Sequence, residues 1–404
     1  MPSSKVKKIL QQGADISIIN LVDSLIEHAF EVHVSDIHIE PTENSVRVRL
    51  RIDGVLQDAH LFPKDIHSEI VSRIKILAGL RTDEHQAAQD GRFRSIIEGS
   101  GPVDIRVSIV PTYFGETIVL RLLIDSAEQF TLDMLGFSAS DRQKILKAIK
   151  NPYGMILSTG PTGSGKTTTL YTIIKMLNKD DVSIITIEDP IEYAISGIKQ
   201  IQVNQRTGLT FANGLKAVLR QDPNIIMVGE IRDAETAGIA VNTALTGHLL
   251  LSTLHTNDAS TTLPRLLDMK VEPFLIASTV NIAIGQRLVR RLCTFCKEEK
   301  KISENEVKSL KEVIPTIDLK KGRVFYFGKG CDKCNNSGYA GRIGINEVLV
   351  VDEEIREVIL KKSSASELKK VAIKNGMTPM IEDGFKKAEV GITTIEEVLR
   401  VIHE

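Results

Sequence analysis

The sequence predicts a mixed α/β protein, in which a small α+β domain precedes a larger α/β domain with a mostly parallel sheet. From residue 154 onward, short apolar runs alternate with helical stretches; the runs read MILS, SIITI, IIMVG and LLLSTL. This alternation is typical of parallel strands flanked by helices. Earlier in the chain, residues 46–52 read VRVRLRI, where apolar residues and arginines alternate strictly. That pattern predicts a strand with one buried face.

The domain boundaries follow from shifts in composition. We expect a tail at 1–14, a small domain at 15–124, a polar, turn-rich linker at 125–140 and the larger domain at 141–404. Residues 352–404 have the pattern of C-terminal helices.

Several local elements are expected inside these domains. The apolar spacing of residues 15–34 predicts an amphipathic helix, and residues 106–123 predict a hairpin. Three Ser/Thr-x-x-Glu/Gln patterns predict helix starts with capping boxes. They begin at Ser140, Ser364 and Thr394.

Composition restricts the class of protein. The chain has 404 residues, 42% hydrophobic content and a net charge of −1, which are ordinary for a globular protein without general affinity for polyanions. No apolar run reaches the length of a membrane-spanning helix, and the start MPSSKVKKILQQG lacks the apolar core of a signal peptide. Together with only four cysteines, this predicts a cytoplasmic protein.

A phosphate-binding loop is the most specific motif. STGPTGSGKTTTL contains G-x-x-x-x-G-K-T between an expected strand and an expected helix, which is the context that the motif requires. Backbone N–H groups and the helix N-terminus would surround phosphate oxygens. Lys166 would reach the β- and γ-phosphates of ATP, and Thr167 would bind Mg²⁺. The loop residues are Gly160, Pro161, Thr162, Gly163, Ser164, Gly165, Lys166, Thr167 and Thr168.

Carboxylates end two further expected strands. VSIITIEDPIEY contains Glu188 and Asp189, and NIIMVGEIRD contains Glu230. In an open parallel sheet, ligands lie beyond the carboxyl ends of the strands, so these acids can face the nucleotide. Hydrolysis requires one group that orients or deprotonates water and another that supports Mg²⁺. The sequence leaves open which glutamate has which role.

Two histidines flank the apolar run 249–251. His248 and His255 are seven positions apart and need not share a face. Either one would act as a sensor of the γ-phosphate at a strand end, or as a hydrogen-bonded framework residue.

The four cysteines form two C-x-x-C pairs, Cys293/Cys296 and Cys331/Cys334. We weighed a redox dithiol, buried inert thiols and a Zn(Cys)₄ site, and the repeated pairs favour zinc. Four thiolates leave no open position on the metal, so the expected role of the subregion 290–345 is structural.

Three arginines of VRVRLRI, Arg47, Arg49 and Arg51, share one strand face. Such a face can bind nucleic acid. No aromatic residues interleave with them, so we favour an exposed strand face or a subunit contact and expect no stable nucleic-acid partner.

Several ordered blocks resemble a known family. GPTGSGKTTTLY, ITIEDPIEY, LRQDPNIIMVGEIRDAETA and TGHLLLSTLHTNDA are similar to the Walker A, Asp box, Walker B and His box of the secretion ATPase superfamily. SDIHIEP, QDGRF, PTYFGETIVLRLL and the cysteine pairs narrow the resemblance to assembly ATPases of type IV pilus and type II secretion machines.

The resemblance implies an architecture and a function. It implies a PAS-like domain, called N2, followed by a RecA-like P-loop ATPase domain with a tetracysteine zinc insertion. It also implies a homohexamer that hydrolyses Mg-ATP and works a platform protein at the cytoplasmic face of the inner membrane, with membrane association through such partners. Arg106 and Arg121 resemble the N2 arginines that approach the nucleotide phosphates, and Arg92 in QDGRF is a weaker third candidate.

Alternatives remain at this stage. A pilus retraction ATPase, a nucleic-acid translocase of the same superfamily and a nucleotide-gated scaffold share the ATPase core. Pilus assembly and type II secretion are not distinguished by these motifs. Many members carry a further N-terminal domain, whereas only about 14 residues precede the first expected helix of N2. Either the domain is absent or the chain is a piece of a longer protein.

Overall fold

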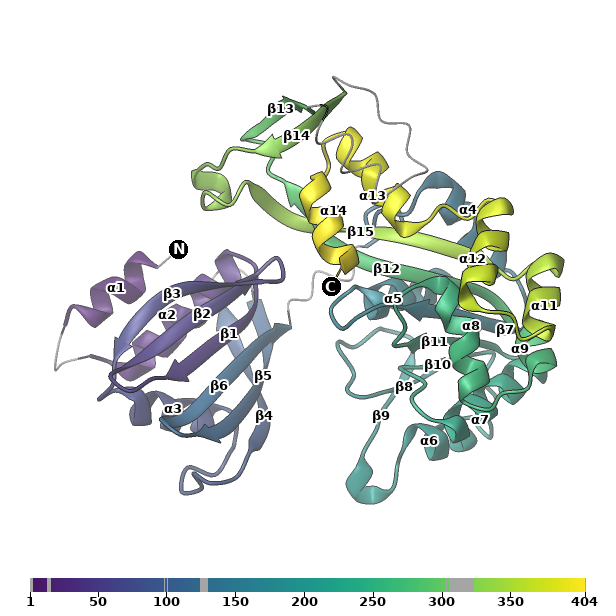
Figure 1. The fold of residues 1–404 in the computed structure, drawn as a ribbon. Helices are drawn as coiled ribbons and strands as arrows, with labels where there is room; N and C mark the ends of the chain where they lie inside the picture. The colour runs from purple at the N-terminus through teal and green to yellow at the C-terminus, as the bar shows by residue number, and fades with distance from the viewer. Residues whose placement is uncertain are drawn as a thin grey trace. The chain divides into compact units, whose positions relative to one another are not determined.

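The computed structural model describes residues 3–12, 16–97, 99, 101–123, 130–302, 304 and 323–403. The chain divides into two compact units, Met1–Glu128 and Gln129–Glu404, which are described separately (Figure 1). Among the described helices, none combines the length and apolar character that crossing a bilayer requires.

The smaller unit is built on a six-stranded antiparallel sheet with the strand order β3-β2-β1-β6-β5-β4 (Figure 1). Its elements are α1 (Ser4–Leu10), α2 (Ile18–Glu31), β1 (Val34–Pro41), β2 (Ser45–Ile52), β3 (Val55–Pro63), α3 (His67–Leu77), β4 (Gln89–Ile97), β5 (Gly101–Thr112) and β6 (Gly115–Leu123).

The expected elements of this unit are present. VRVRLRI lies in β2, where Val46, Val48 and Leu50 are buried in the core, because alternate side chains of a strand face the same side. The predicted helix is α2, and the predicted hairpin is β5–β6. Part of the expected tail forms α1, whose Val6 is fully buried in the same core.

The larger unit contains a seven-stranded sheet with the order β15-β12-β7-β11-β10-β8-β9. All neighbours are parallel except β12 and β15. The strands are β7 (Gly154–Thr159), β8 (Ile184–Glu188), β9 (Lys199–Gln202), β10 (Ile225–Val228), β11 (Leu249–Leu254), β12 (Val280–Leu292) and β15 (Tyr339–Val350).

Helices cover both faces of this sheet, so the inner strands β7, β8, β10 and β11 are buried at every position, whereas the edge strand β9 is partly exposed. One face packs on α4 (Ala139–Ala148) and α5 (Lys166–Leu177). The other packs on α6 (Phe211–Val218), α7 (Ala234–Leu245), α8 (Ala259–Asp268), α9 (Pro273–Thr279), α11 (Glu353–Leu360) and α12 (Ala365–Lys374). The mixed α/β class with a mainly parallel sheet is confirmed.

The two longest strands of the larger unit, β12 and β15, were not predicted individually. They pair antiparallel and lead to the short hairpin-like pair β13 (Lys297–Lys301) and β14 (Val324–Gly328). A separate core joins this end to α13 (Met380–Glu389) and α14 (Ile395–His403) (Figure 1). Part of the expected subregion 290–345 lies outside the described residues, as does part of the expected linker.

Two of the three predicted helix starts are confirmed. The hydroxyls of Ser364 and Thr394 accept hydrogen bonds from the N–H groups of Glu367 and Glu397, respectively. The third prediction was wrong by two residues, because Ser138 caps α4 and accepts from the N–H of Asp141. Ser138 directly precedes α4, whereas Ser140 is already the second residue of the helix, so only Ser138 has the extended backbone of a cap.

Candidate active site

The phosphate loop connects the carboxyl end of β7 to the first turn of α5. Gly163 and Gly165 have φ angles of +77° and +90°, a region in which residues with a Cβ are strained. At Gly160 a Cβ would lie 2.3 Å from the carbonyl oxygen of Gln286 on β12, so space as well as conformation demands glycine there. The loop therefore keeps its backbone N–H groups open towards a ligand.

Lys166 lies at the beginning of α5 and is buried. Its Nζ donates to the carbonyl oxygens of Gly160 and Pro161, at 2.8 and 2.9 Å. Burial lowers the pKa of Lys166 to about 8, although the charge of Glu230 opposes this shift. The ammonium thus occupies the loop in which phosphate oxygens are expected. Thr167, next to it, is partly exposed at the same helix end.

Glu230 follows β10 and lies between two partners. Arg232 approaches one carboxylate oxygen at 2.6 Å, and Nε2 of His255 approaches the other at 3.2 Å. His255 follows β11, the neighbour of both β7 and β10. The structure therefore brings Glu230 and His255 together at the carboxyl edge of the sheet, where the phosphate loop also begins.

Glu188 ends β8 but is enclosed by hydrogen-bond donors. Its carboxylate accepts from the hydroxyl of Tyr171, from the hydroxyl of Thr186 at 2.5 Å and from the amide of Gln200 at 3.2 Å. Burial, followed by the charge of Glu188, raises the pKa of Tyr171, so this phenol keeps its proton and donates it. Glu188 is only 2% exposed, and the described structure uses it as an internal acceptor.

Asp189 and His248 lie at opposite edges of the sheet. Asp189, directly after β8, is exposed at the carboxyl edge of the sheet. His248 precedes β11, and its carbonyl accepts from the N–H of Gly154 at the start of β7. A six-residue strand separates it from the edge with the phosphate loop, roughly 20 Å away. The structure does not bring His248 to the loop.

The arginines suggested by the resemblance lie in the smaller unit. Arg106 on β5 pairs in register with Arg121 on β6, and Arg92 on β4 pairs with Arg106. Nε of Arg121 lies 2.8 Å from Asp36, and the Arg121 side chain is 58% exposed. The three arginines thus form one row across neighbouring strands.

The arginines of VRVRLRI are matched by carboxylates. Arg47 binds Asp58 through two hydrogen bonds of 2.6 and 2.9 Å. Arg49 binds Glu40 likewise, at 2.9 and 2.5 Å. Arg51 lies 3.4 Å from Asp36. These partners compensate the charge of the face, so it is not a continuous positive strip of the kind that binds polyanions.

The four cysteines converge although 34 residues separate the two pairs in sequence. Their sulfurs all lie within 4.8 Å of one another. The Sγ atoms of Cys293 and Cys331 are 3.8 Å apart, and those of Cys296 and Cys334 are 3.7 Å apart. Sulfurs at the corners of a tetrahedron around zinc would be about 3.8 Å apart for bonds of about 2.3 Å. The donor set and its spacing therefore fit a Zn(Cys)₄ site, and the distances exclude disulfides in this structure.

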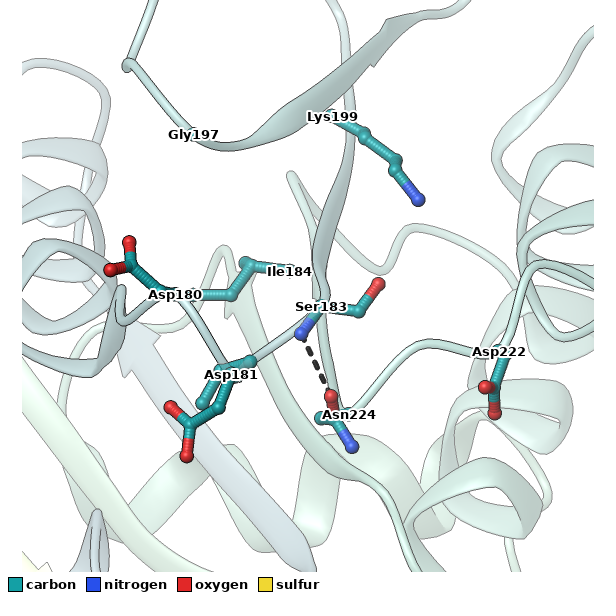
Figure 2. A pocket seen from close by; sticks show the side chains of 9 residues that line it. Asp180, Asp181, Ser183, Ile184, Gly197, Lys199, Asp222 and Asn224 are labelled. Atoms are coloured by element: carbon teal, nitrogen blue, oxygen red, sulfur yellow. Dashed lines mark hydrogen bonds between the residues drawn. The ribbon is translucent and has the colours of Figure 1, made fainter.

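A surface depression lies elsewhere on the larger unit, at the amino ends of β8 and β10 (Figure 2). Asn224 accepts there from the N–H of Ser183 at 2.7 Å and ties the two strands together. Asp180, Asp181 and Asp222 are the acids around it. This edge is opposite to the phosphate loop, so the depression is not the nucleotide site.

The sequence analysis missed several residues of the site. Arg232 stands in the quoted block GEIRD, two residues after Glu230, but received no role. Tyr171 and Gln200 control the surroundings of Glu188, and Gln286 supports the phosphate loop from β12. Tyr171 ends the quoted block GPTGSGKTTTLY but received no role, and no local motif marks Gln200 or Gln286, because their partners lie on other elements.

Comparison with known proteins agrees with these features. The family model "Type II/IV secretion system protein" matches residues 11–400. The type II secretion system protein E of Xanthomonas campestris is 45% identical over 99% of this chain and 70% of its own length. The type IV pilus assembly ATPase PilB of Thermus thermophilus is 48% identical over 94% of this chain, but over only 42% of its own length.

Solved structures agree on the fold. A crystal structure of the pilus retraction motor PilT with bound ADP is 26% identical, with a TM-score of 0.64 over 94% of this chain and 96% of that chain. The Legionella pneumophila ATPase DotB has a TM-score of 0.68 at 24% identity over 95% of both chains, a likeness that concerns the fold alone.

Proposed function

The chain belongs to the type II/IV secretion system protein family, and we propose that it is the homohexameric motor of a pilus-assembly or type II secretion machine. Membership of this family, the P-loop ATPase fold and ATPase activity were predicted from the sequence motifs and are confirmed. Assembly and secretion are favoured over retraction, because relatives named for the former are 45% and 48% identical and the retraction motor only 26%.

The observation that carries the proposed mechanism is the meeting of Lys166, Glu230 and His255 at one sheet edge. The phosphate loop would bind the ATP phosphates with its backbone N–H groups and the N-terminus of α5. Lys166 would then exchange the carbonyls of Gly160 and Pro161 for phosphate oxygens. Its charge offsets the negative charge that develops during transfer.

Mg²⁺ would be held by Thr167, and it would neutralise phosphate charge at the same place. Thr168, in the first turn of α5, and the exposed Asp189, directly after β8, would be further ligand-facing groups. The residues fit this role, since hydroxyl and carboxylate oxygens are the ligands that Mg²⁺ prefers.

Glu230 is the best placed group to orient the attacking water. It is a carboxylate beside Lys166, and Arg232 and His255 hold its two oxygens in position. His255 would report on the γ-phosphate through its contact with Glu230. We assign Glu188 to positioning, because its buried carboxylate already accepts three hydrogen bonds. His248 has no part in this site within one protomer.

Arg106 and Arg121 would supply further positive charge from the smaller unit. They form a row with Arg92, and Arg121 would exchange its contact with Asp36 for a phosphate oxygen. An arginine that arrives only when domains close can act in the transition state, and such residues contribute roughly 10³–10⁵ in rate elsewhere.

The hexamer, the platform protein and the location at the cytoplasmic face of the inner membrane complete the proposal. They rest on the resemblance to assembly ATPases of pilus and secretion machines, which agrees with the names of the relatives, a secretion protein and a pilus assembly ATPase. Light scattering of the purified chain with a non-hydrolysable ATP analogue should give the mass of six chains. Lys166→Ala should lose at least ~100-fold in ATP turnover. A monomer under these conditions, or unchanged turnover, would contradict the proposal.

Zinc is proposed at the four cysteines, with a structural role. It would join the end of β12 to the segment before β15 and so stabilise the outer part of these strands. Metal analysis of the purified chain should find about one zinc per chain. Cys331→Ser should lose the metal and lower the unfolding temperature, while Ser337→Ala nearby should keep it. A value well below one zinc in the wild type would refute this assignment.

A further inference from the structure

Gln286 is a buried polar residue without an assigned role, and it lies directly beneath the phosphate loop. It is one position past Gly285, the last residue of β12 that pairs with β7, next to the start of the loop. Its backbone carbonyl is the atom that a Cβ on Gly160 would strike at 2.3 Å. Its side-chain amide lies under Gly165, where a Cβ would be 3.6 Å from Cδ, Nε2 and Oε1 alike. The residue thus contacts both ends of the loop.

The two polar atoms of the Gln286 amide differ in their hydrogen bonding. Oε1 accepts a hydrogen bond of 2.8 Å from the hydroxyl of Thr169, which lies one turn into α5. Nε2 has no partner among the described residues, although Gln286 is fully buried. A buried donor without an acceptor costs about 1–3 kcal/mol. Such a cost is understandable if the acceptor becomes available only in another state of the site.

The contacts of Lys166 indicate in which state of the site an acceptor for Nε2 would become available. Here its Nζ donates to the carbonyls of Gly160 and Pro161. A phosphate group in the loop attracts this ammonium, and the two carbonyls then lose their donor. Gly160 lies directly against the backbone of Gln286, and Pro161 is the next residue. Nε2 of Gln286, a donor without an acceptor among the described residues, and the carbonyls of Gly160 and Pro161, which would lose their donor, therefore belong to neighbouring parts of the same site.

We propose that Gln286 is a positioning residue for nucleotide binding, whose Nε2 donates to a carbonyl of the phosphate loop once Lys166 has turned to the phosphates. The amide then holds the loop in its nucleotide-bound form. The inference uses the ATPase activity of the family and does not depend on the hexamer or on the secretion machine.

The test measures ADP binding by calorimetry on the full chain. Gln286→Met fills the same space without a donor and should weaken ADP binding about 5–10-fold, the value of one such hydrogen bond. The KM for ATP should rise by the same factor with kcat within about twofold, because the contact is made in the ground state and the transition state alike. A residue that only packs the core would change neither value in the folded protein.

Two further variants separate the donor from the acceptor. Thr169→Val keeps Nε2 and should weaken ADP binding at most about twofold. Gln286→Glu keeps an acceptor for Thr169 but replaces the donor by an oxygen, so it should bind ADP at least as weakly as Gln286→Met. The double variant Gln286→Met/Thr169→Val removes both partners of the bond, so its stability without nucleotide should remain near that of the wild type.

The outcome is decisive in either direction. ADP affinity of Gln286→Met within twofold of the wild type would overturn the proposal. So would a loss in Thr169→Val as large as that in Gln286→Met, because the Thr169 bond alone would then support the loop. If Gln286→Met folds poorly, the same comparison is made between the double variant and Thr169→Val.

Discussion

Glu188 and Glu230 end two neighbouring parallel strands of the same sheet, yet their environments are opposite. Ile187 of β8 pairs with Val228 of β10. Glu188 comes one residue after Ile187, whereas Glu230 comes two residues after Val228. Side chains alternate along a strand, so Glu188 shares the face of Thr186, which α5 covers. Glu230 instead meets Arg232 and His255 at the edge. A difference of one position thus separates an enclosed acceptor from a carboxylate that can act on a ligand.

The largest effect should come from Glu230. Glu230→Gln keeps the shape but removes the negative charge that orients water, so kcat should fall about 10²–10⁴-fold. ADP affinity should change little, because the group acts on the attacking water and not on the bound nucleotide. Turnover and calorimetric ADP binding are measured on the same preparation. If kcat stays within tenfold of the wild type, Glu230 is not the group that orients water.

Glu188 should show the reverse pattern. Glu188→Gln replaces one accepting oxygen by an NH₂ group that faces donors, so the free energy of unfolding of the larger unit should fall by about 1–3 kcal/mol. kcat should fall less than about tenfold. Tyr171→Phe is the matched variant, since it removes one of the three donors and keeps the carboxylate. The two changes should be less than additive, because they affect one bond.

One result would contradict the different roles given to Glu188 and Glu230. A Glu188→Gln enzyme that is as stable as the wild type and as inactive as Glu230→Gln would show that both carboxylates act in the reaction. The buried contacts of Glu188 would then describe only the nucleotide-free state.

The same two glutamates show what the sequence predicts well and what it does not. The phosphate loop and the strand-end acids were located from local patterns, because the motif needs a strand before it and a helix after it. The difference between the acids was not predictable, since it depends on Tyr171 from α5 and Gln200 from β9. Gln286 escaped for the same reason, as it reaches the loop from a strand about 120 residues later.

The two histidines show what the direction of a strand adds to a local motif. The sequence already places it before the apolar run of β11 and His255 after it. In a parallel sheet only residues after a strand lie at the ligand edge, so the direction of the strand distinguishes the two histidines. Within one protomer, this rule favours His255 over His248 as a residue of the nucleotide site.

The smallest expected difference between Glu188 and Glu230 concerns the pH dependence of nucleotide binding. Burial lowers the pKa of Lys166 to about 8, and Glu230 is the carboxylate whose charge opposes this shift. Below pH 8 the lysine is protonated and attracts phosphate. Above pH 8 the free protein loses this charge, and binding must take up a proton, so ADP affinity should fall by at most about tenfold per pH unit between pH 8 and 9.5. Calorimetry across this range measures the slope.

Lys166→Met should give weak binding with a flat profile, and Glu230→Gln should shift the fall in ADP affinity to lower pH, whereas Glu188→Gln should leave it in place. A profile of the wild type that is flat up to pH 9.5 would contradict this account of Lys166.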